Sequence, residues 1–360
     1  MQQKHGGNLR EISRRYGVPE KEILDFSANI NPLGTPKTAI KAVLQEMDRL
    51  VQYPETDAMT LRETLSSRDR IPPENILAGN GSTEFIYLIP RVLRPKRALI
   101  PMPSYSDYES ALSLAGSAVV HFPLRKEEAF ALDTDRFIQQ MQKDVDLVLI
   151  CNPNNPTGGL VPCGEMKKIL SASGDSKVTL VIDEAFMDFV LGESFRFRVT
   201  EYENLLVLRS LTKFYGIPGL RSGALYGSEP LMERIRIHQE PWTVNRLSQA
   251  AAIAALSDEA YRQAAVALVR EQRDYLIHEL GGIPGVRVFP SQANFLLIET
   301  SPPLPEPERL FESLLRSGIL VRNCASFPGL GPVFSRVAVR MHEENLLLIQ
   351  AMKKAVRKLA

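Results

Sequence analysis

The amino-acid sequence predicts an α/β protein, with a large domain built on a mostly parallel sheet flanked by helices and a smaller C-terminal α+β domain. First, short β-rich runs alternate with helical segments from residue 76 to residue 227, which is typical of a parallel sheet. Second, the runs 146–151, 178–183 and 205–208 are continuously apolar, as strands covered on both faces are. Third, long helices rich in alanine and charge follow Trp242 and precede several short strands.

The N-terminal stretch, residues 1–30, mixes turn-forming residues with isolated apolar ones, so we expect an arm rather than a packed unit. A helix is predicted next, with Thr35 as its N-cap and Pro36 at its first position. The helix should end at Tyr53, because the following proline disfavours helical backbone there. Its apolar positions share one face at helical spacing: Ile40, Val43, Leu44, Met47 and Leu50.

The middle of the chain is expected to form a strand at 97–100, a helix at 104–115 that Gly116 ends, and a strand at 118–122. Ligands of parallel α/β sheets bind beyond the carboxyl ends of the strands. Polar clusters occupy three such strand ends, after Cys151, at Asp183 and after Leu208. The sequence therefore predicts a binding site at this edge of the sheet.

The C-terminal part should contain helices at 247–256 and 261–280, followed by a glycine-rich break. The strand candidates that follow are 286–289, 295–298, 319–322 and 336–339. The expected division of the chain is an arm (1–30), a large domain (31–240) and a small domain (241–360).

Composition narrows the class of protein. A chain of 360 residues with 44% apolar and 24% charged residues is ordinary for a soluble globular protein. With 43 Lys and Arg against 42 Asp and Glu, the net charge of +1 argues against general binding to nucleic acid or a membrane surface. No apolar run approaches the ~18–20 residues that cross a bilayer. Three cysteines without a CxxC pair favour a reducing compartment, so we expect a cytoplasmic protein without a bound metal.

A single lysine, Lys213, follows the apolar run 205–208 within one turn. Lysine condenses with aldehydes, so this residue can anchor a carbonyl cofactor. Ser210 and Arg221 flank it with a hydroxyl and a fixed cation, both suited to a phosphate. An ordinary solvated lysine is the alternative, and Lys213 taken alone favours that alternative.

Other strand ends carry groups that suit such a cofactor. Asn155 can hydrogen-bond a ring oxygen, although turn formation alone also explains it. A carboxylate at the end of a buried strand, as Asp183 is, needs a partner. It can hold a pyridinium N–H and keep the ring positive, or it can cap the next segment. Ala185 is small enough to lie flat against a ring.

The run Gly79-Asn80-Gly81-Ser82-Thr83 precedes an apolar helix, and free N–H groups at a helix start suit a phosphate. An ordinary N-cap at Ser82 is the alternative. Tyr105 can stack on an aromatic cofactor, although an interior aromatic would have the same pattern.

Four strings occur in order along the chain: GNGST (79–83), NNPTG (154–158), DEAF (183–186) and SLTKFYGIPGLR (210–221). Together they resemble the fold-type I pyridoxal-phosphate enzymes of the aspartate aminotransferase superfamily, over nearly the whole chain. The resemblance implies pyridoxal 5′-phosphate as cofactor and gives the candidates their roles. Lys213 would attach the cofactor, Asp183 would hold the pyridinium nitrogen and Asn155 would bond the phenolic oxygen.

The same resemblance implies that Tyr105 stacks on the ring and that Tyr53 reaches the cofactor phosphate of a neighbouring subunit, in a homodimer with shared sites. Arg340 would clamp the substrate carboxylate, unless it is an exposed arginine at a strand end. Phe186 stands where many relatives have tyrosine, which removes one hydrogen bond to the phenolic oxygen. The implied phosphate cup comprises Gly81, Ser82, Thr83, Ser210 and Arg221.

Within the superfamily, the chain is similar to the group that holds histidinol-phosphate aminotransferases and threonine-phosphate decarboxylases. The stretches 5–8, 25–32 and 322–329 resemble the decarboxylases of cobalamin synthesis. A phosphorylated substrate needs a second anion site. The side chains that would supply it are His5, Arg322 and, more weakly, Asn8 and Asn31.

The resemblance favours a decarboxylase of L-threonine O-3-phosphate, with a histidinol-phosphate or related aminotransferase as the alternative and a non-catalytic phosphometabolite-binding protein as a remote one. A decarboxylase of L-threonine O-3-phosphate breaks the bond from Cα to the carboxylate, whereas an aminotransferase breaks the Cα–H bond, and residue types do not reveal which bond is aligned. Release of CO₂ or of a 2-oxo acid distinguishes the two enzymes. A non-catalytic protein that binds a phosphorylated metabolite would show no turnover.

Overall fold

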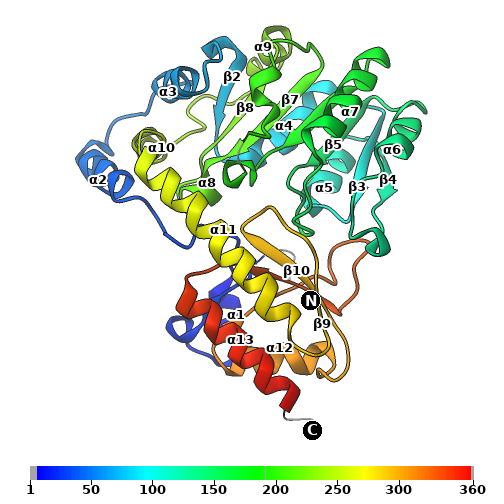
Figure 1. Cartoon of the computed structure of the whole chain (residues 1–360). Helices are drawn as coiled ribbons and strands as arrows, with labels where there is room; N and C mark the ends of the chain where they lie inside the picture. The colour runs from blue at the N-terminus through cyan, green and yellow to red at the C-terminus, as the bar shows by residue number, and fades with distance from the viewer. Residues whose placement is uncertain (1–5, 191, 358–360) are drawn as a thin grey trace.

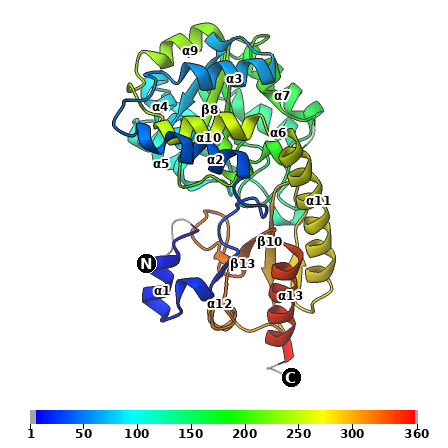
Figure 2. The same cartoon turned by 90° about the vertical axis from the view of Figure 1, so that its left-hand side faces the viewer.

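The computed structural model describes residues 6–190 and 192–357. Within these ranges the chain forms two bodies, which the long helix α11 (Glu259–Gly281) connects (Figures 1 and 2). The larger body, at the top of Figure 1, contains a seven-stranded sheet in the order β2-β8-β7-β6-β5-β3-β4. Its strands are β2 (Ile76–Gly79), β3 (Arg97–Met102), β4 (Ala118–Pro123), β5 (Leu147–Cys151), β6 (Thr179–Asp183), β7 (Leu205–Ser210) and β8 (Gly223–Gly227).

The strands from β4 to β7 run parallel. Strand β8 is antiparallel to β7, and the edge strand β2 is antiparallel to β8, so β2 runs in the same direction as the parallel strands. Both faces of the sheet are buried. In β7, Leu205 and Val207 pack into one hydrophobic core, whereas Leu206 and Leu208 pack into the other. Burial on both faces explains why these strands are continuously apolar in sequence, and the predicted mostly parallel α/β sheet is confirmed.

Helices cover both faces of this sheet and supply the rest of the two cores. On one face lie α4 (Ser82–Leu93), α5 (Ser106–Leu114) and α9 (Glu229–Arg236). On the other lie α2 (Lys37–Glu46), α3 (Met59–Asp69), α6 (Thr134–Met141), α7 (Cys163–Asp175) and α10 (Arg246–Leu256).

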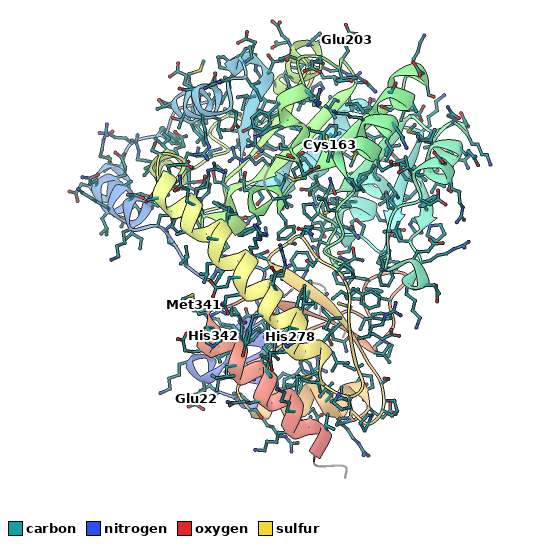
Figure 3. The ribbon with its side chains drawn as sticks, viewed as in Figure 1. Glu22, Cys163, Glu203, His278, Met341 and His342 are labelled. Carbon is teal, nitrogen blue, oxygen red and sulfur yellow. The ribbon has the colours of Figure 1, made fainter. Side chains whose placement is uncertain are left out.

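The smaller body holds a four-stranded antiparallel sheet in the order β12-β13-β10-β9 and a parallel pair, β1 with β11. Its strands are β1 (Leu24–Asp25), β9 (Val286–Val288), β10 (Phe295–Thr300), β11 (Ile319–Leu320), β12 (Arg322–Asn323) and β13 (Phe334–Ala338). Its helices are α1 (Leu9–Tyr16), α12 (Pro307–Arg316) and α13 (His342–Arg357). Figure 3 shows that His278 and His342 lie on its helices α11 and α13.

The N-terminal stretch is more structured than the sequence suggested. Ile12 of α1 is buried against Leu315 and Leu320, and β1 pairs with β11. The expected arm therefore packs on the smaller body (Figure 2), because its isolated apolar residues find partners that lie about 300 residues away along the chain. The predicted boundary at residue 240 stays a prediction.

The helix predicted after Thr35 exists as α2, but it begins one residue later than expected. Pro36 is the N-cap, and the Thr35 hydroxyl instead donates a hydrogen bond to the Gly216 carbonyl oxygen at 2.6 Å. Within the predicted apolar stripe, Val43 packs against the core, but the other four positions stay exposed. Its exposed residues are Ile40, Leu44, Met47 and Leu50, of which Leu44 is 67% exposed.

Short 3₁₀ segments connect several elements: Glu20–Glu22, Met47–Arg49, Pro73–Asn75, Lys126–Glu128, Met187–Phe189 and Phe195–Arg198. In the described part of the chain, we find no helix that combines the length and the apolar character needed to cross a bilayer. The same residues contain no group of three or more His, Cys, Asp or Glu arranged to hold a metal ion.

Candidate active site

A cavity of about 450 Å³ lies between the two bodies. The smaller body contributes Arg322 and Arg336 to its wall. From the larger body it is lined by residues that follow the carboxyl ends of parallel strands: Tyr105 after β3, Asn155 after β5, Phe186 after β6 and Lys213 after β7. This is the edge of the sheet at which the sequence predicted a binding site.

Lys213 lies in the short helix α8 (Leu211–Phe214), which directly follows β7. Its ammonium group donates a hydrogen bond to Thr212 Oγ1 at 3.1 Å. Burial lowers the pKa of Lys213 to about 8, and the positive charge of Arg221 acts in the same direction, whereas Asp183 opposes both. A lysine with such a pKa has a substantial neutral fraction near neutral pH, and the neutral amine is the form that attacks an aldehyde.

Asp183 closes β6 and is buried. Its Oδ1 accepts a hydrogen bond from the Ala185 N–H at 2.9 Å, and its Oδ2 accepts one from the Tyr108 hydroxyl at 2.7 Å. Burial raises the pKa of Asp183, and the Tyr108 hydrogen bond, the Ala185 N–H and the charge of Lys213 hold it down. The lysine and the aspartate thus lie close enough for each charge to act on the other.

The residues of the predicted phosphate cup lie together where three strands meet. The sheet register pairs Gly223 of β8 with Gly79 on one side and with Ser210 on the other. A Cβ at Gly223 would lie 2.3 Å from the backbone nitrogen of Ser82, so only glycine allows the start of α4 to approach this closely. The free N–H groups of that helix start therefore lie beside the Ser210 end of β7.

Arg221 supplies the cation of this cup. One of its terminal nitrogens lies 3.5 Å from Thr83 Oγ1. Gly81 has φ +77°, and a Cβ there would lie 2.5 Å from the same guanidinium. Ser210 Oγ shares a hydrogen bond with Thr212 Oγ1 at 2.7 Å. The cup thus combines helix N–H groups, hydroxyls and one arginine, as an organic phosphate requires.

Arg336, which the sequence analysis did not nominate, is buried in the wall of the cavity. Its guanidinium donates hydrogen bonds to Asn155 Oδ1 and, at 2.8 Å, to the Ser27 carbonyl oxygen. Because Asn155 Oδ1 accepts this hydrogen bond, the amide nitrogen of Asn155 can donate to a ring oxygen. Burial lowers the pKa of Arg336 to about 10, which still leaves it positive at neutral pH.

Arg340, the predicted carboxylate clamp, lies elsewhere. Strand β13 ends at Ala338, and the chain then turns into α13. The Arg340 guanidinium pairs with Glu344 at 2.7 Å, and Arg340 does not line the cavity. The structure therefore contradicts that assignment, and Arg336 has the position that the clamp needs.

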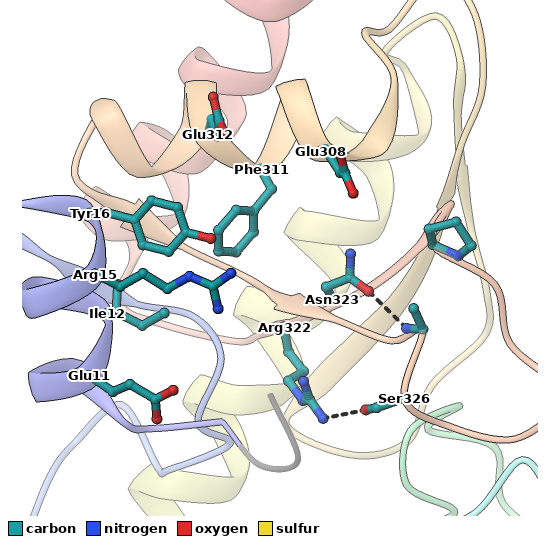
Figure 4. A pocket seen from close by; sticks show the side chains of 12 residues that line it. Glu11, Ile12, Arg15, Tyr16, Glu308, Phe311, Glu312, Arg322, Asn323 and Ser326 are labelled. Atoms are coloured by element: carbon teal, nitrogen blue, oxygen red, sulfur yellow. Dashed lines mark hydrogen bonds between the residues drawn. The ribbon is translucent and has the colours of Figure 1, made fainter. Parts of the chain in front are cut away.

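Arg322 occupies the neighbouring strand β12, directly opposite Arg336 in the antiparallel register. It is buried, and it donates a hydrogen bond to Ser326 Oγ at 2.7 Å. Figure 4 shows this bond at the edge of a second cavity of about 510 Å³, between α1 and α12, whose wall also includes Arg15. Arg322 thus separates the two cavities, and two guanidinium groups from paired strands face the site of Lys213.

The remaining predicted residues divide into two groups. Tyr105 lines the cavity and meets Tyr108 edge-on, with ring centroids 5.5 Å apart. Ala185 holds Asp183 through its N–H. Phe186 packs edge-on against Phe295. Unlike a tyrosine, it has no hydroxyl that could donate a hydrogen bond.

Of the other predicted residues, Asn31, Asn8 and Tyr53 do not line this cavity. Asn31 is buried, but its side chain bonds the Phe214 carbonyl and the Leu33 N–H, so it supports the Lys213 turn instead of facing a ligand. Asn8 caps α1. Tyr53 is 78% exposed beside Trp242. His5 lies outside the described residues.

The fold and the site define a class of protein. A profile of the family "aminotransferase class I and II" matches residues 21–350, and the chain belongs to this family. It is 37% identical, over 99% of its length and 97% of the relative, to threonine-phosphate decarboxylase of Salmonella typhimurium. It is 36% identical, over 97% of its length and 40% of the relative, to an adenosylcobalamin biosynthesis bifunctional protein of Leptospira interrogans.

Among solved structures, histidinol-phosphate aminotransferase of Clostridium acetobutylicum aligns with a TM-score of 0.87 at 32% identity, covering 93% of this chain and 100% of the other. These findings confirm the predicted family and fold, and they confirm the predicted cofactor, pyridoxal phosphate.

The residues fit that cofactor. A buried carboxylate suits the ring nitrogen, the amine of Lys213 suits the aldehyde, and the start of α4 with Arg221 suits the phosphate. Asn29 also lines the cavity, and its buried Oδ1 has no hydrogen-bond partner among the described residues, so a polar group is still to be accommodated there. Arg336, Tyr108 and Asn29 escaped the sequence analysis because their roles depend on contacts across the fold.

Proposed function

We propose that this chain decarboxylates L-threonine O-3-phosphate to CO₂ and (R)-1-amino-2-propanol O-2-phosphate, in the aminopropanol branch of cobalamin synthesis. The observation that carries the proposal is the pair Arg322 and Arg336, which face the cavity of Lys213 from directly opposed positions of two strands. Two fixed cations suit a small substrate that carries both a carboxylate and a phosphate. The similarity to threonine-phosphate decarboxylase over nearly the full length supports the same reading.

Pyridoxal phosphate, when bound, withdraws electrons from the bond that breaks at the substrate Cα. The chain's own residues supply the rest. Lys213 attaches the cofactor and, once the substrate amine has replaced it, its ammonium can return a proton to Cα. Asp183 supplies the negative charge that keeps the ring nitrogen protonated. Arg336 orients the carboxylate and Arg322 the phosphate, so that the scissile bond is held in one direction.

A histidinol-phosphate or related aminotransferase is the second candidate, which the similarity to the Clostridium acetobutylicum enzyme favours. Purified protein loaded with pyridoxal phosphate should be incubated with L-threonine O-3-phosphate, and the gas and the organic products measured. We expect stoichiometric CO₂ and the amino alcohol phosphate. Formation of a 2-oxo acid from a phosphorylated substrate, without CO₂, would establish the aminotransferase instead.

Replacing Arg322 by alanine should weaken the binding of phosphorylated ligands by roughly 10–100-fold, because a charge-assisted hydrogen bond contributes about 1.5–3 kcal/mol. Substrate and product both carry the phosphate, so calorimetric titration should show both weakened alike. Pyridoxal phosphate should remain bound. Unaltered affinity for threonine phosphate in the variant would exclude Arg322 from the substrate site.

The exposed stripe of α2 is proposed to be covered by a second copy of this chain, in a homodimer. Val51 is 90% exposed and Tyr53 78% exposed next to this stripe, a concentration of apolar surface that is unusual on a monomer. The predicted reach of Tyr53 into the neighbouring site requires such a dimer.

The few unpaired cysteines favour the cytoplasm as the compartment of the proposed enzyme.

A Leu44→Asp variant should weaken this dimer by at least roughly 10–100-fold, because a buried leucine contributes about 1.5–3 kcal/mol. Analytical ultracentrifugation across a concentration series measures the change. Leu114→Asp, at a leucine that is 78% exposed at the end of α5, is the matched control and should leave the oligomer unchanged. A wild-type protein that sediments as a monomer at all concentrations would refute the dimer.

A further inference from the structure

Tyr108 is a buried side chain to which the proposed reaction assigns no role. It lies in α5, one turn after Tyr105, and is 1% exposed. Its hydroxyl donates a hydrogen bond of 2.7 Å to Asp183 Oδ2, across 75 residues of sequence. Its ring meets that of Tyr105 at 80°, with centroids 5.5 Å apart. One side chain thus touches both the acid expected at the ring nitrogen and the aromatic expected on the ring face.

The hydrogen bonds of Asp183 explain why this contact matters. A buried carboxylate tends to become neutral unless donors stabilise its negative charge. Among the described residues, Asp183 has two such donors, the Tyr108 hydroxyl and the Ala185 N–H, one on each oxygen. The backbone donor is fixed by the turn after β6, so Tyr108 is the side-chain donor that a substitution can remove.

Tyr108 can serve only as a donor in this position. Burial raises the pKa of its phenol well above the ordinary value, and the charge of Asp183 raises it further, so the proton stays on the hydroxyl. The other titratable groups around Asp183 are Lys213, the Cys151 thiol and the Tyr105 phenol. Burial raises the pKa of Cys151 and of Tyr105, so both remain neutral, and Lys213 is positive below about pH 8.

We propose that Tyr108 is a positioning residue that keeps Asp183 ionised and oriented toward the cofactor ring nitrogen, and that it thereby sets the affinity for the cofactor. The inference rests on the cofactor of the proposed function but not on its substrate. The hydroxyl acts through Asp183, and the ring edge supports Tyr105 independently of the hydroxyl. A phenylalanine at this position retains the ring and removes the hydroxyl, and with it the hydrogen bond to Asp183 and the contact with the Cys151 thiol.

The test uses pyridoxamine phosphate, which lacks the aldehyde and so binds without reacting with Lys213. We expect Tyr108→Phe to weaken its binding by roughly 10–100-fold, since hydrogen bonds to charged groups contribute at this scale. Loss of the donor raises the pKa of Asp183 further, so Asp183 is protonated at a higher pH in the variant. As the pH is lowered, the affinity should therefore fall at a midpoint that is higher in the variant than in the wild type, by about one pH unit for each tenfold effect of the lost hydrogen bond.

Three controls separate this role from simple packing. Tyr226→Phe removes a comparable bond of 2.8 Å, from a fully buried tyrosine to the buried Asp69 outside the site, and should not move the pH midpoint. An analogue of the cofactor with carbon in place of the ring nitrogen should bind wild type and Tyr108→Phe alike. In an Asp183→Asn background, Tyr108→Phe should change the affinity for pyridoxamine phosphate much less than in the wild type.

Equal affinity and an equal pH midpoint in wild type and Tyr108→Phe would overturn the proposal. An equal loss of affinity for pyridoxamine phosphate and for its carbon analogue would also overturn it, because the effect would then not pass through the ring nitrogen. These readouts concern cofactor binding, so a failure of the decarboxylase assignment, seen as absent CO₂, leaves them interpretable.

Discussion

A Lys213→Ala protein should lose turnover of threonine phosphate by at least about 10²–10⁴-fold, which is the range that removal of a single general acid or base covers. The loss follows because one amine is expected to attach the cofactor and to return the proton to Cα. The visible absorbance of the covalently attached cofactor should disappear as well. Stopped assays of CO₂ and an absorbance spectrum of the dialysed protein measure both effects.

The cup formed by the start of α4 and Arg221 does not involve this amine, so the variant should still bind pyridoxal phosphate reversibly. Lys168→Ala is a suitable control, because Lys168 forms an exposed pair with Glu165 at 2.9 Å on α7. It should leave both activity and absorbance unchanged. Full activity in the Lys213→Ala protein would show that another group carries the reaction.

An Arg336→Ala variant, which lacks the guanidinium, should bind threonine phosphate ~10²–10⁴-fold more weakly than the wild type. The reason is that two charge-assisted hydrogen bonds to one carboxylate contribute about 1.5–3 kcal/mol each. The reaction product has the same amine and phosphate but no carboxylate. Its affinity for Arg336→Ala should therefore change little. Calorimetric titration of the two ligands against the same variant isolates the contribution of the carboxylate.

The matched control is Arg340→Ala, at the arginine that the sequence favoured for this role. Arg340 pairs with Glu344 away from the cavity, so both ligands should bind to that variant as they do to the wild type. If Arg340→Ala lost affinity for the substrate and Arg336→Ala did not, Arg340 would be the residue that binds the carboxylate. If Arg336→Ala lost comparable affinity for substrate and for product, this arginine would not bind the carboxylate.

Much of the site could be predicted because its residues occur in short strings at strand ends. A continuous apolar run with a polar end indicates a buried parallel strand, and the carboxyl ends of such strands meet at one edge. Lys213, Asp183 and Asn155 follow this rule: Lys213 and Asn155 line one cavity, and Asp183 lies close enough to Lys213 for their charges to interact. The local sequence was enough to predict these positions, because the strand that precedes each residue determines where that residue lies.

The second anion site was harder to predict, because the smaller body is held together by contacts between distant segments. The sequence pattern predicted a strand over 336–339, and Arg340 at its end was therefore assigned as the carboxylate clamp. The strand in fact stops at Ala338, and the antiparallel register sets Arg336, not Arg340, opposite Arg322. Similarly, the spacing of the apolar stripe on α2 was predicted, but most of this stripe stays exposed in the described part of the chain.

The sequence by itself determined the α/β class, the family, the cofactor and the lysine that would attach it, because these depend on periodicity and on strings of neighbouring residues. Only the tertiary structure decided which arginine faces the lysine, that the first thirty residues pack on the smaller body, and that Tyr108 reaches Asp183. Those features depend on where strands end and on which distant segments they meet, and burial and register in three dimensions set both.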